Sequence, residues 1–98
     1  MELEGRSAIV TGGGRGIGRA IALAYAENGA DVVIGARGAE ALAKTRAEIA
    51  ATGQRALAVQ ADMTRDEDLT KLVGETVAMF GGVDILVNNA GAGTFAPI

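Results

Sequence analysis

The sequence contains no cysteine and no histidine among its 98 residues. Without cysteine there is neither a disulfide framework nor a thiolate metal site. Without histidine the chain lacks the commonest general base and the commonest metal ligand. These absences exclude catalysis by a cysteine or a histidine within this sequence, and we expect no metal site.

Aromatic residues, positive charge and long apolar runs are also scarce. Aromatic side chains make up 3% of the sequence, and the formal net charge is −3. Phosphate-backbone binding needs a basic surface, so nucleic acid is not an expected partner. No apolar run approaches the roughly 20 residues of a membrane-spanning helix, and Met1–Glu4 does not resemble the start of a signal peptide. We therefore expect a cytoplasmic protein that binds neither nucleic acid nor membrane.

What the sequence does contain is a regular alternation of apolar runs and helical patterns. Hydrophobic residues make up 49% of the chain, which is typical of a globular protein. We expect one small domain over residues 1–98. The predicted strands are Ser7–Val10, Asp31–Gly35, Arg55–Gln60 and Val83–Val87.

Three helices are predicted between these strands, from apolar residues that recur every three or four positions. The first two run over about Gly16–Asn28 and Ala39–Thr52. The third follows Thr64–Glu67, which has the pattern of a capping box, and ends at Gly81. The stripe that this helix should bury consists of Leu69, Leu72, Val73, Val77 and Phe80.

This alternation predicts an α/β fold of the Rossmann type, with a parallel sheet and helices on both faces. Right-handed crossovers place the strands in the order 3-2-1-4. The topological switch point then lies between strands 1 and 4, where ligands bind at the carboxyl ends of the strands. The glycine-bearing segments Thr11–Gly18 and Asn88–Gly93 both fall at that edge.

The segment Thr11–Gly18 reads TGGGRGIG, directly between the first strand and the first helix. The free amides and the positive dipole end of a helix N-terminus attract an anion there. Gly12, Gly16 and Gly18 have no Cβ, so a ligand and the backbone can approach closely. A pyrophosphate site is the favoured interpretation, and turn chemistry alone is the alternative. The pattern is not a P-loop, because no Lys-Ser/Thr pair follows the last glycine.

The residues after the second strand bear on the choice of cofactor. An acidic residue there would bond the ribose 2′-hydroxyl of NAD, but this chain has Gly35, Ala36 and Arg37. Small residues leave room for a 2′-phosphate, and a guanidinium can bind it with two hydrogen bonds. Arg15 in the glycine turn could reach the same phosphate. NADP(H) is therefore favoured over NAD(H), and the alternative for each arginine is a solvated surface charge.

Polar residues follow the third and fourth strands as well. Asp62 could accept a hydrogen bond from an adenine amine, or it could satisfy the backbone amides of its own turn. Asn88 and Asn89 could tie neighbouring loops together or contact a ribose. For Asn88 the structural tie is favoured, with its backbone near the ligand. The single tyrosine, Tyr25, lies on the apolar face of the first helix and should pack in or near the core.

Three motifs in order resemble the short-chain dehydrogenases/reductases. TGGGRGIG at Thr11–Gly18 is similar to the family's TGxxxGxG motif, and NNAG at Asn88–Gly91 is similar to its NNAG motif. Asp62, with Thr64 two residues on, resembles the aspartate that contacts adenine in that family. The likeness covers nearly the whole chain and only the N-terminal half of the family's fold, before its fifth strand. It implies that residues 1–98 form a dinucleotide-binding (Rossmann) half-domain. Within the family, the 3-oxoacyl-(acyl carrier protein) reductase and glucose dehydrogenase type is the nearest likeness.

The resemblance implies a role for each matching residue. Gly12, Arg15 and Gly16 would line the pyrophosphate and ribose together with Ile17 and Gly18. Arg37 would meet the adenosine ribose or its 2′-phosphate. The remaining cofactor-binding residues would be Asp62 and Met63 beside the adenine, and Asn88, Ala90 and Gly91 beside the ribose near the nicotinamide.

One departure from the family limits these expectations. The family's hydride transfer uses a serine and a Tyr-x-x-x-Lys pair, whereas here Gly29 stands four residues after Tyr25. We therefore assign no catalytic residue and expect an oxidoreductase half that is inactive by itself. The alternatives are a self-assembling Rossmann fragment, excised or designed, with little cofactor affinity, and, more weakly, a binder of S-adenosylmethionine.

The fourth strand and the face covered by the third helix also predict self-association. The Val83–Val87 strand would be an apolar edge with open hydrogen-bonding groups, which invites pairing. One helix cannot cover the whole second face, so bare alanine, valine and isoleucine are expected there. We expect a two-fold dimer joined at the strand 4 edge or over the bare sheet face.

Overall fold

The computed structural model describes residues 2–12, 14 and 16–89. Strands and helices alternate along the chain as the sequence predicts, with ends that differ by a few residues. Their bounds are β1 Ser7–Thr11, α1 Gly16–Glu27, β2 Asp31–Ala36, α2 Ala39–Ala50, β3 Ala56–Gln60, α3 Asp66–Phe80 and β4 Ile85–Asn88. None of the helices in this described part has the length and apolar content that a membrane crossing requires.

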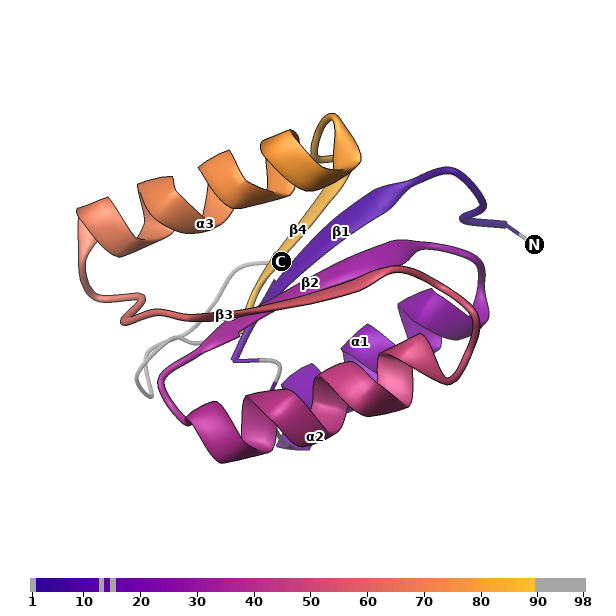
Figure 1. Ribbon diagram of the computed structural model, residues 1–98, viewed down its shortest axis with the longest axis horizontal. Coiled ribbons are helices and arrows are strands. Elements are labelled where there is room, and N and C mark those ends of the chain that lie inside the picture. Colours follow the sequence, from indigo (N-terminus) through magenta and orange to yellow (C-terminus); the bar gives the residue numbers. More distant parts are fainter. Residues whose placement is uncertain (1, 13, 15, 90–98) are drawn as a thin grey trace.

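The four strands form one parallel sheet in the order β3-β2-β1-β4, which confirms the predicted topology. Ile9 on β1 lies opposite Val33 on β2 and Leu86 on β4. Figure 1 shows α1 and α2 side by side on one face of the sheet and α3 alone on the other. The carboxyl ends of β1 and β4 therefore meet at the switch point, where the glycine turn also begins.

The core has two layers, one on each face of the sheet. Because successive strand residues point to opposite faces, Val10 and Ile34 join the layer under α1 and α2. Ile9 and Val33 join the layer under α3, together with Leu72 of that helix. All five side chains are large and fully buried. The apolar strand runs are thus explained by burial on both faces.

The predicted buried stripe of α3 is only partly right. Leu72 and Thr76 are fully buried, whereas Leu69, Val73 and Val77 are between 36% and 47% exposed. The helix is rotated because Leu72 packs directly onto Gly35, where an added Cβ would lie 2.9 Å from Leu72 Cδ2. Thr76 is tolerated in the core because its hydroxyl donates a hydrogen bond to the Leu72 carbonyl at 2.8 Å.

Exposed apolar residues on this side differ from those expected on a bare sheet face. Ile9 and Val33 are covered, and Leu86 of β4 is the apolar strand residue that stays exposed, at 54%. One flank of α3 is bonded to the residues on either side of β3. The Asp68 carboxylate accepts a hydrogen bond from the Asp62 amide, and the Met79 carbonyl accepts one from the Arg55 side chain. The opposite flank of α3 therefore lies toward β4. We call the residues of this area the α3–β4 surface; they are Leu69, Val73, Val77 and Leu86.

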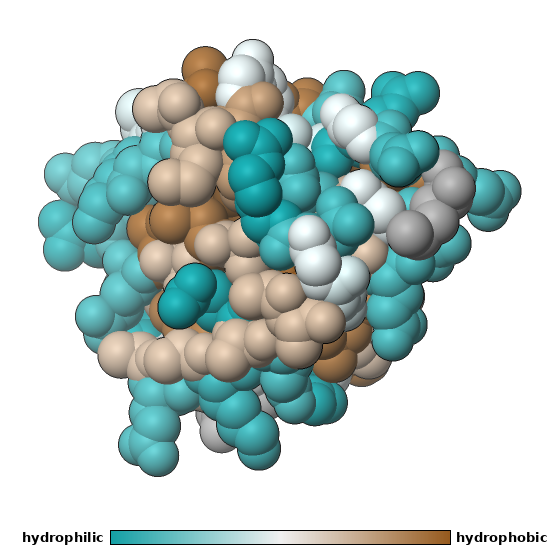
Figure 2. All heavy atoms as spheres, turned by 45° about the vertical axis from the view of Figure 1, so that its right-hand side comes forward, coloured by the Kyte–Doolittle hydropathy of each residue, from teal (hydrophilic) through white to brown (hydrophobic). Residues whose placement is uncertain are grey.

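A second apolar area lies along the other edge of the sheet. A groove of about 480 Å³ runs beside β3 and is lined mainly by alanine and leucine residues of β3 and α2. Figure 2 shows apolar atoms gathered across the middle of one face of the molecule, with hydrophilic side chains around them. The fold therefore leaves apolar surface at both edges of the sheet.

Candidate functional site

The glycine turn joins β1 to α1 at the switch point. Gly12 and Gly16 have positive φ angles of 71° and 63°, a backbone conformation that favours glycine. The Gly12 amide donates a hydrogen bond to the Gly35 carbonyl at 2.6 Å, which fixes the start of the turn to β2. Ile17, in the first turn of α1, is 71% exposed, so an apolar side chain stands open beside the turn.

Gly18 is the position where packing itself demands glycine. A Cβ there would collide with the carbonyl oxygen of Gly12, and it would lie 2.9 Å from Nδ2 of Asn89. The turn thus folds back onto the first turn of α1. The close packing of Gly12 on Gly18 leaves no room for a side chain between them.

The ends of β1 and β4 are tied by the hydroxyl of Thr11. Thr11 Oγ1 lies 3.2 Å from both the Val87 carbonyl and Oδ1 of Asn88, and it accepts a hydrogen bond from the Asn89 amide at 2.9 Å. This is the structural tie expected for the Asn88 side chain. It holds the start of the predicted NNAG segment against the start of the glycine turn.

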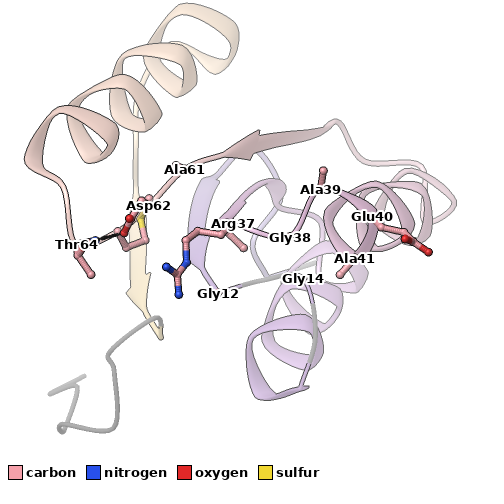
Figure 3. Close-up of a pocket in the computed structure, with 12 residues that line it drawn as sticks. Gly12, Gly14, Arg37, Gly38, Ala39, Glu40, Ala41, Ala61, Asp62 and Thr64 are labelled. Atoms are coloured by element: carbon pink, nitrogen blue, oxygen red, sulfur yellow. Dashed lines mark hydrogen bonds between the residues drawn. The ribbon is translucent and has the colours of Figure 1, made fainter.

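A cavity of about 610 Å³ opens beside the glycine turn, at the carboxyl ends of β2 and β3 (Figure 3). It brings together Gly12, Arg37, Asp62 and Met63, four of the residues predicted to bind a cofactor. Figure 3 shows the Arg37 side chain reaching into the space between Gly12 and Asp62. Gly16, Ile17, Gly18 and Asn88 do not line this cavity; they lie on the α1 and β4 side of the turn.

Asp62 is held in one orientation by its own turn. Its Oδ1 accepts hydrogen bonds from the Thr64 amide at 2.9 Å and from Thr64 Oγ1 at 2.6 Å. These bonds lower the pKa of Asp62, and the nearby positive charges of Arg37 and Arg65 lower it further. Among the described residues both bonds go to Oδ1, so Oδ2 remains an acceptor for a ligand.

The predicted capping box is wrong, because Thr64 bonds to Asp62 rather than to the helix. The helix α3 begins at Asp66, and its N-cap residue, Arg65, makes no side-chain capping bond. Asp68 instead reaches back and accepts a hydrogen bond from the Asp62 amide at 2.7 Å. The acidic first turn of α3 therefore supports the Asp62 turn from behind.

The loop after β2 brings Arg37 and the start of α2 to the same cavity. Gly38 is the N-cap residue of α2 and offers no side chain to its amides, so the first turn of this helix faces the cavity uncapped. Gln60 Nε2 donates a hydrogen bond to the Arg37 carbonyl at 2.8 Å, which fixes the loop. Sequence reasoning missed Gln60, since an exposed glutamine at a strand end carries no distinctive pattern.

Two further contacts join α2 to the glycine turn and to α1, the helix that follows the turn. Thr45 Oγ1 donates a hydrogen bond to the Gly14 carbonyl at 2.9 Å. Arg19 on α1 forms a two-bonded ion pair with Glu48 on α2, at 2.8 and 2.5 Å, which lowers the pKa of Glu48. Sequence reasoning missed both contacts. The only signal was a polar residue, Thr45, at an apolar position of the helical pattern.

Three predicted site residues, Arg15, Ala90 and Gly91, lie outside the described residues, and their roles remain predictions. Tyr25 packs against the buried layer under α1 and α2 and is partly exposed, which confirms its predicted place near the core.

Known proteins resemble this chain over most of its length. An uncharacterized oxidoreductase of Mycobacterium tuberculosis, MT0954, is 47% identical over 93% of this chain and 35% of its own length. The apo form of glucose dehydrogenase from Caenorhabditis elegans matches 94% of this chain and 40% of that one, at 42% identity with a TM-score of 0.87. A xylitol dehydrogenase with bound NAD⁺ matches 93% of this chain and 35% of that one, at 36% identity with a TM-score of 0.89.

The chain thus spans little more than a third of the length of these relatives. The family model for short chain dehydrogenases matches residues 6–98, which is nearly the whole sequence. Members of this family are oxidoreductases that bind NAD(P) dinucleotides. The chain belongs to the short chain dehydrogenase family.

Proposed function

We propose that this chain is the NAD(P)-binding part of an oxidoreductase. The observation that carries the proposal is the cavity shared by Gly12, Arg37 and Asp62. It combines an anion-attracting turn, a guanidinium and a free carboxylate oxygen within one cavity beside the glycine turn. The bound NAD⁺ in the related xylitol dehydrogenase supports the same class of ligand.

In this proposal the adenosine half of the cofactor lies in the cavity. Asp62 Oδ2 accepts a hydrogen bond from the adenine amine, and Met63 packs beside the ring. The pyrophosphate lies over Gly12, Arg15, Gly16, Ile17 and Gly18, and Asn88, Ala90 and Gly91 border the ribose of the nicotinamide. When bound, the nicotinamide ring supplies the hydride chemistry.

We further propose that the preferred cofactor is NADP(H). Arg37 lines the cavity beside the uncapped first turn of α2, so a 2′-phosphate placed there would meet a guanidinium and free amides. Neither Gly35 nor Ala36 offers the carboxylate that would bond a free 2′-hydroxyl and repel a phosphate.

Hydride transfer by these 98 residues alone is not expected. The only tyrosine, Tyr25, packs near the core and has no lysine four residues later. We propose that this chain binds the cofactor and that reduction of a carbonyl substrate needs residues it does not contain. Hydride transfer from NADPH to a ketone by the isolated chain would contradict this part of the proposal.

The competing function is a structural fragment with little cofactor affinity. One contact favours it: Gly18 is required by the approach of the Gly12 carbonyl, so the motif would persist for packing alone. Calorimetric titration with NADPH, NADH and S-adenosylmethionine separates the candidates. Submillimolar NADPH binding supports the proposal, binding of none of the three supports the structural fragment, and preferential binding of S-adenosylmethionine would replace both.

We also propose that two copies associate through the α3–β4 surface. Leu86 projects from the edge strand β4, next to the exposed flank of α3, so pairing would cover apolar side chains and open strand groups together. Light scattering after gel filtration should give a dimer for the wild type and a monomer for Leu86→Glu. Met79→Glu places the same charge on the β3 side of α3 and should remain dimeric. A wild-type monomer at high concentration would contradict the proposal.

A further inference from the structure

We propose that Thr45 is a positioning residue, whose buried hydroxyl holds the glycine turn in the shape that accepts a pyrophosphate. The inference rests on the proposed function, because it assigns the turn a ligand. It adds a residue of α2, outside every motif in the sequence, to the machinery of that site.

The contact itself is short and fully enclosed. Thr45 has no exposed surface, and its Oγ1 donates a hydrogen bond to the Gly14 carbonyl at 2.9 Å. Gly14 is buried and lies directly on α2, since an added Cβ would be 3.3 Å from Cβ of Ala41. The middle of the glycine turn is therefore clamped to a helix 31 residues away in the sequence.

The direction of the Gly14 carbonyl matters to an anion. Gly14 lines the cavity, and a carbonyl oxygen turned toward a phosphate would repel it. The hydrogen bond from Thr45 keeps this oxygen on the α2 side. Without the hydroxyl, a buried carbonyl would lose its partner, which favours its rotation toward the cavity, where water can reach it.

The helix that carries Thr45 is itself firmly placed. Leu42 and Ile49 of α2 are buried in the layer beneath it, and the Arg19–Glu48 ion pair joins α2 to α1. The same helix presents its uncapped N-terminus at Gly38 to the cavity. One rigid element thus sets both the 2′-phosphate end and the pyrophosphate end of the site.

The chain offers a matched control in Thr76. It is also a helical threonine without exposed surface, and its hydroxyl also donates to a backbone carbonyl. That carbonyl belongs to Leu72 in the same helix, and neither residue lines the cavity. Thr76→Val therefore removes a buried hydroxyl without touching the glycine turn.

The test compares two ligands on the full chain. NADPH contains the pyrophosphate, and adenosine 2′-monophosphate contains only the adenosine end. Thr45→Val should weaken NADPH binding about five- to tenfold, the effect of losing one hydrogen bond. It should weaken binding of adenosine 2′-monophosphate less, because that ligand has no pyrophosphate. Thr45→Ser keeps the hydroxyl and should restore NADPH binding, and Thr76→Val should change neither affinity.

A second variant disturbs the same contact from the other side. Gly14→Ala leaves Thr45 intact, but its methyl group would press on Ala41 and move the turn off α2. It should reproduce the selective loss of NADPH binding. This variant decides the question if Thr45→Val does not fold.

The outcomes separate this inference from the proposed function. Equal weakening of both ligands by Thr45→Val, or no weakening of either, would overturn the role of Thr45 and leave the proposed function standing. Wild-type binding of adenosine 2′-monophosphate but not of NADPH would also overturn it, since the turn would then hold no pyrophosphate. Wild-type binding of neither ligand would overturn the proposed function and this inference together.

Discussion

The two ends of the cavity are built in different ways. The turn end is made of backbone. The Gly12 amide donates a hydrogen bond to the Gly35 carbonyl, and the Gly14 carbonyl accepts one from Thr45. Gly18 packs against Gly12. The opposite end is made of side chains, chiefly Arg37 and Asp62 (Figure 3). A substitution in the tightly packed turn must change the path of the backbone, whereas a side chain at the open rim of the cavity can be replaced without moving the backbone. We therefore expect the most disruptive substitution at the turn to weaken cofactor binding most strongly. Substitutions at the rim should have smaller effects, and among them Arg37 should set the selectivity.

The largest effect is expected from Gly18→Ala. The added methyl would collide with the Gly12 carbonyl, so the turn must open. We expect NADPH affinity to fall by about 100-fold, as for misplaced binding groups, and the free energy of unfolding to fall by about 1–3 kcal/mol. Calorimetric titration measures the NADPH affinity, and urea denaturation measures the free energy of unfolding.

Gly74→Ala is the matched control for that change. Gly74 is an exposed glycine in α3 with open space around its Cβ position. Alanine there should raise the free energy of unfolding by roughly 0.5–1 kcal/mol and leave NADPH binding unchanged. If Gly18→Ala folds and binds NADPH as tightly as the wild type, the proposed difference between the two ends of the cavity is wrong.

Arg37→Glu should change selectivity more than stability. A charge-assisted pair with the 2′-phosphate would be replaced by repulsion, so NADPH binding should weaken by about 10- to 100-fold. NADH binding should hold or improve, because a carboxylate can bond the free 2′-hydroxyl. Arg46→Glu makes the same charge change on the exposed side of α2, away from the cavity, and should alter neither affinity. Equal losses for both cofactors would contradict the assigned role of Arg37.

Asp62→Asn should weaken NADPH and NADH alike, by about five- to tenfold. The amide oxygen can still accept from Thr64, so the turn survives, but the other atom becomes a donor facing the adenine amine. Asp66→Asn, on the exposed first turn of α3, is the control. An unchanged affinity of Asp62→Asn for both cofactors would show that Asp62 serves its turn only.

The pH dependence of this site follows from the same contacts. Hydrogen bonds from Thr64 lower the pKa of Asp62, so its carboxylate stays ionised as the pH falls to the ordinary aspartate value of about 3.9. The wild type should therefore bind NADH, which has no 2′-phosphate to titrate, equally well at about pH 7 and about pH 5. A loss of NADH affinity between these values would contradict an ionised Asp62.

The smallest effect is expected from Glu48→Gln, at the support behind the turn. Arg19 lowers the pKa of Glu48, so the ion pair stabilises the fold above the ordinary glutamate pKa of about 4.3 and fades as the pH falls through the lowered value. Urea denaturation should give the variant a slightly lower free energy of unfolding than the wild type at neutral pH, and the same value in strong acid. Glu75→Gln, on the exposed surface of α3, should show no such pH dependence.

The sheet and its switch point could be predicted because the strand runs are strongly apolar and the crossovers between parallel strands are right-handed. The position of Arg37 at the cavity followed from the same topology. The rotation of α3 could not, since the packing of Leu72 onto Gly35 depends on contacts between distant segments. Nor could the Thr64 bond to Asp62, because the capping-box pattern is met equally well by a turn that precedes the helix.

The contact between Thr45 and Gly14 shows the same limit at the site itself. A threonine in an apolar stripe signals that a hydroxyl is buried, but the sequence does not name its partner. The sequence therefore pointed to four residues that line the cavity and missed the ones that hold them in place.

Backbone NMR titration of the full chain with NADPH tests the central claim most directly. The account predicts saturable shifts of the amides at Gly12, Arg37 and Asp62, around the cavity that they share. No shifts at millimolar NADPH, or shifts confined to the groove beside β3, would contradict it.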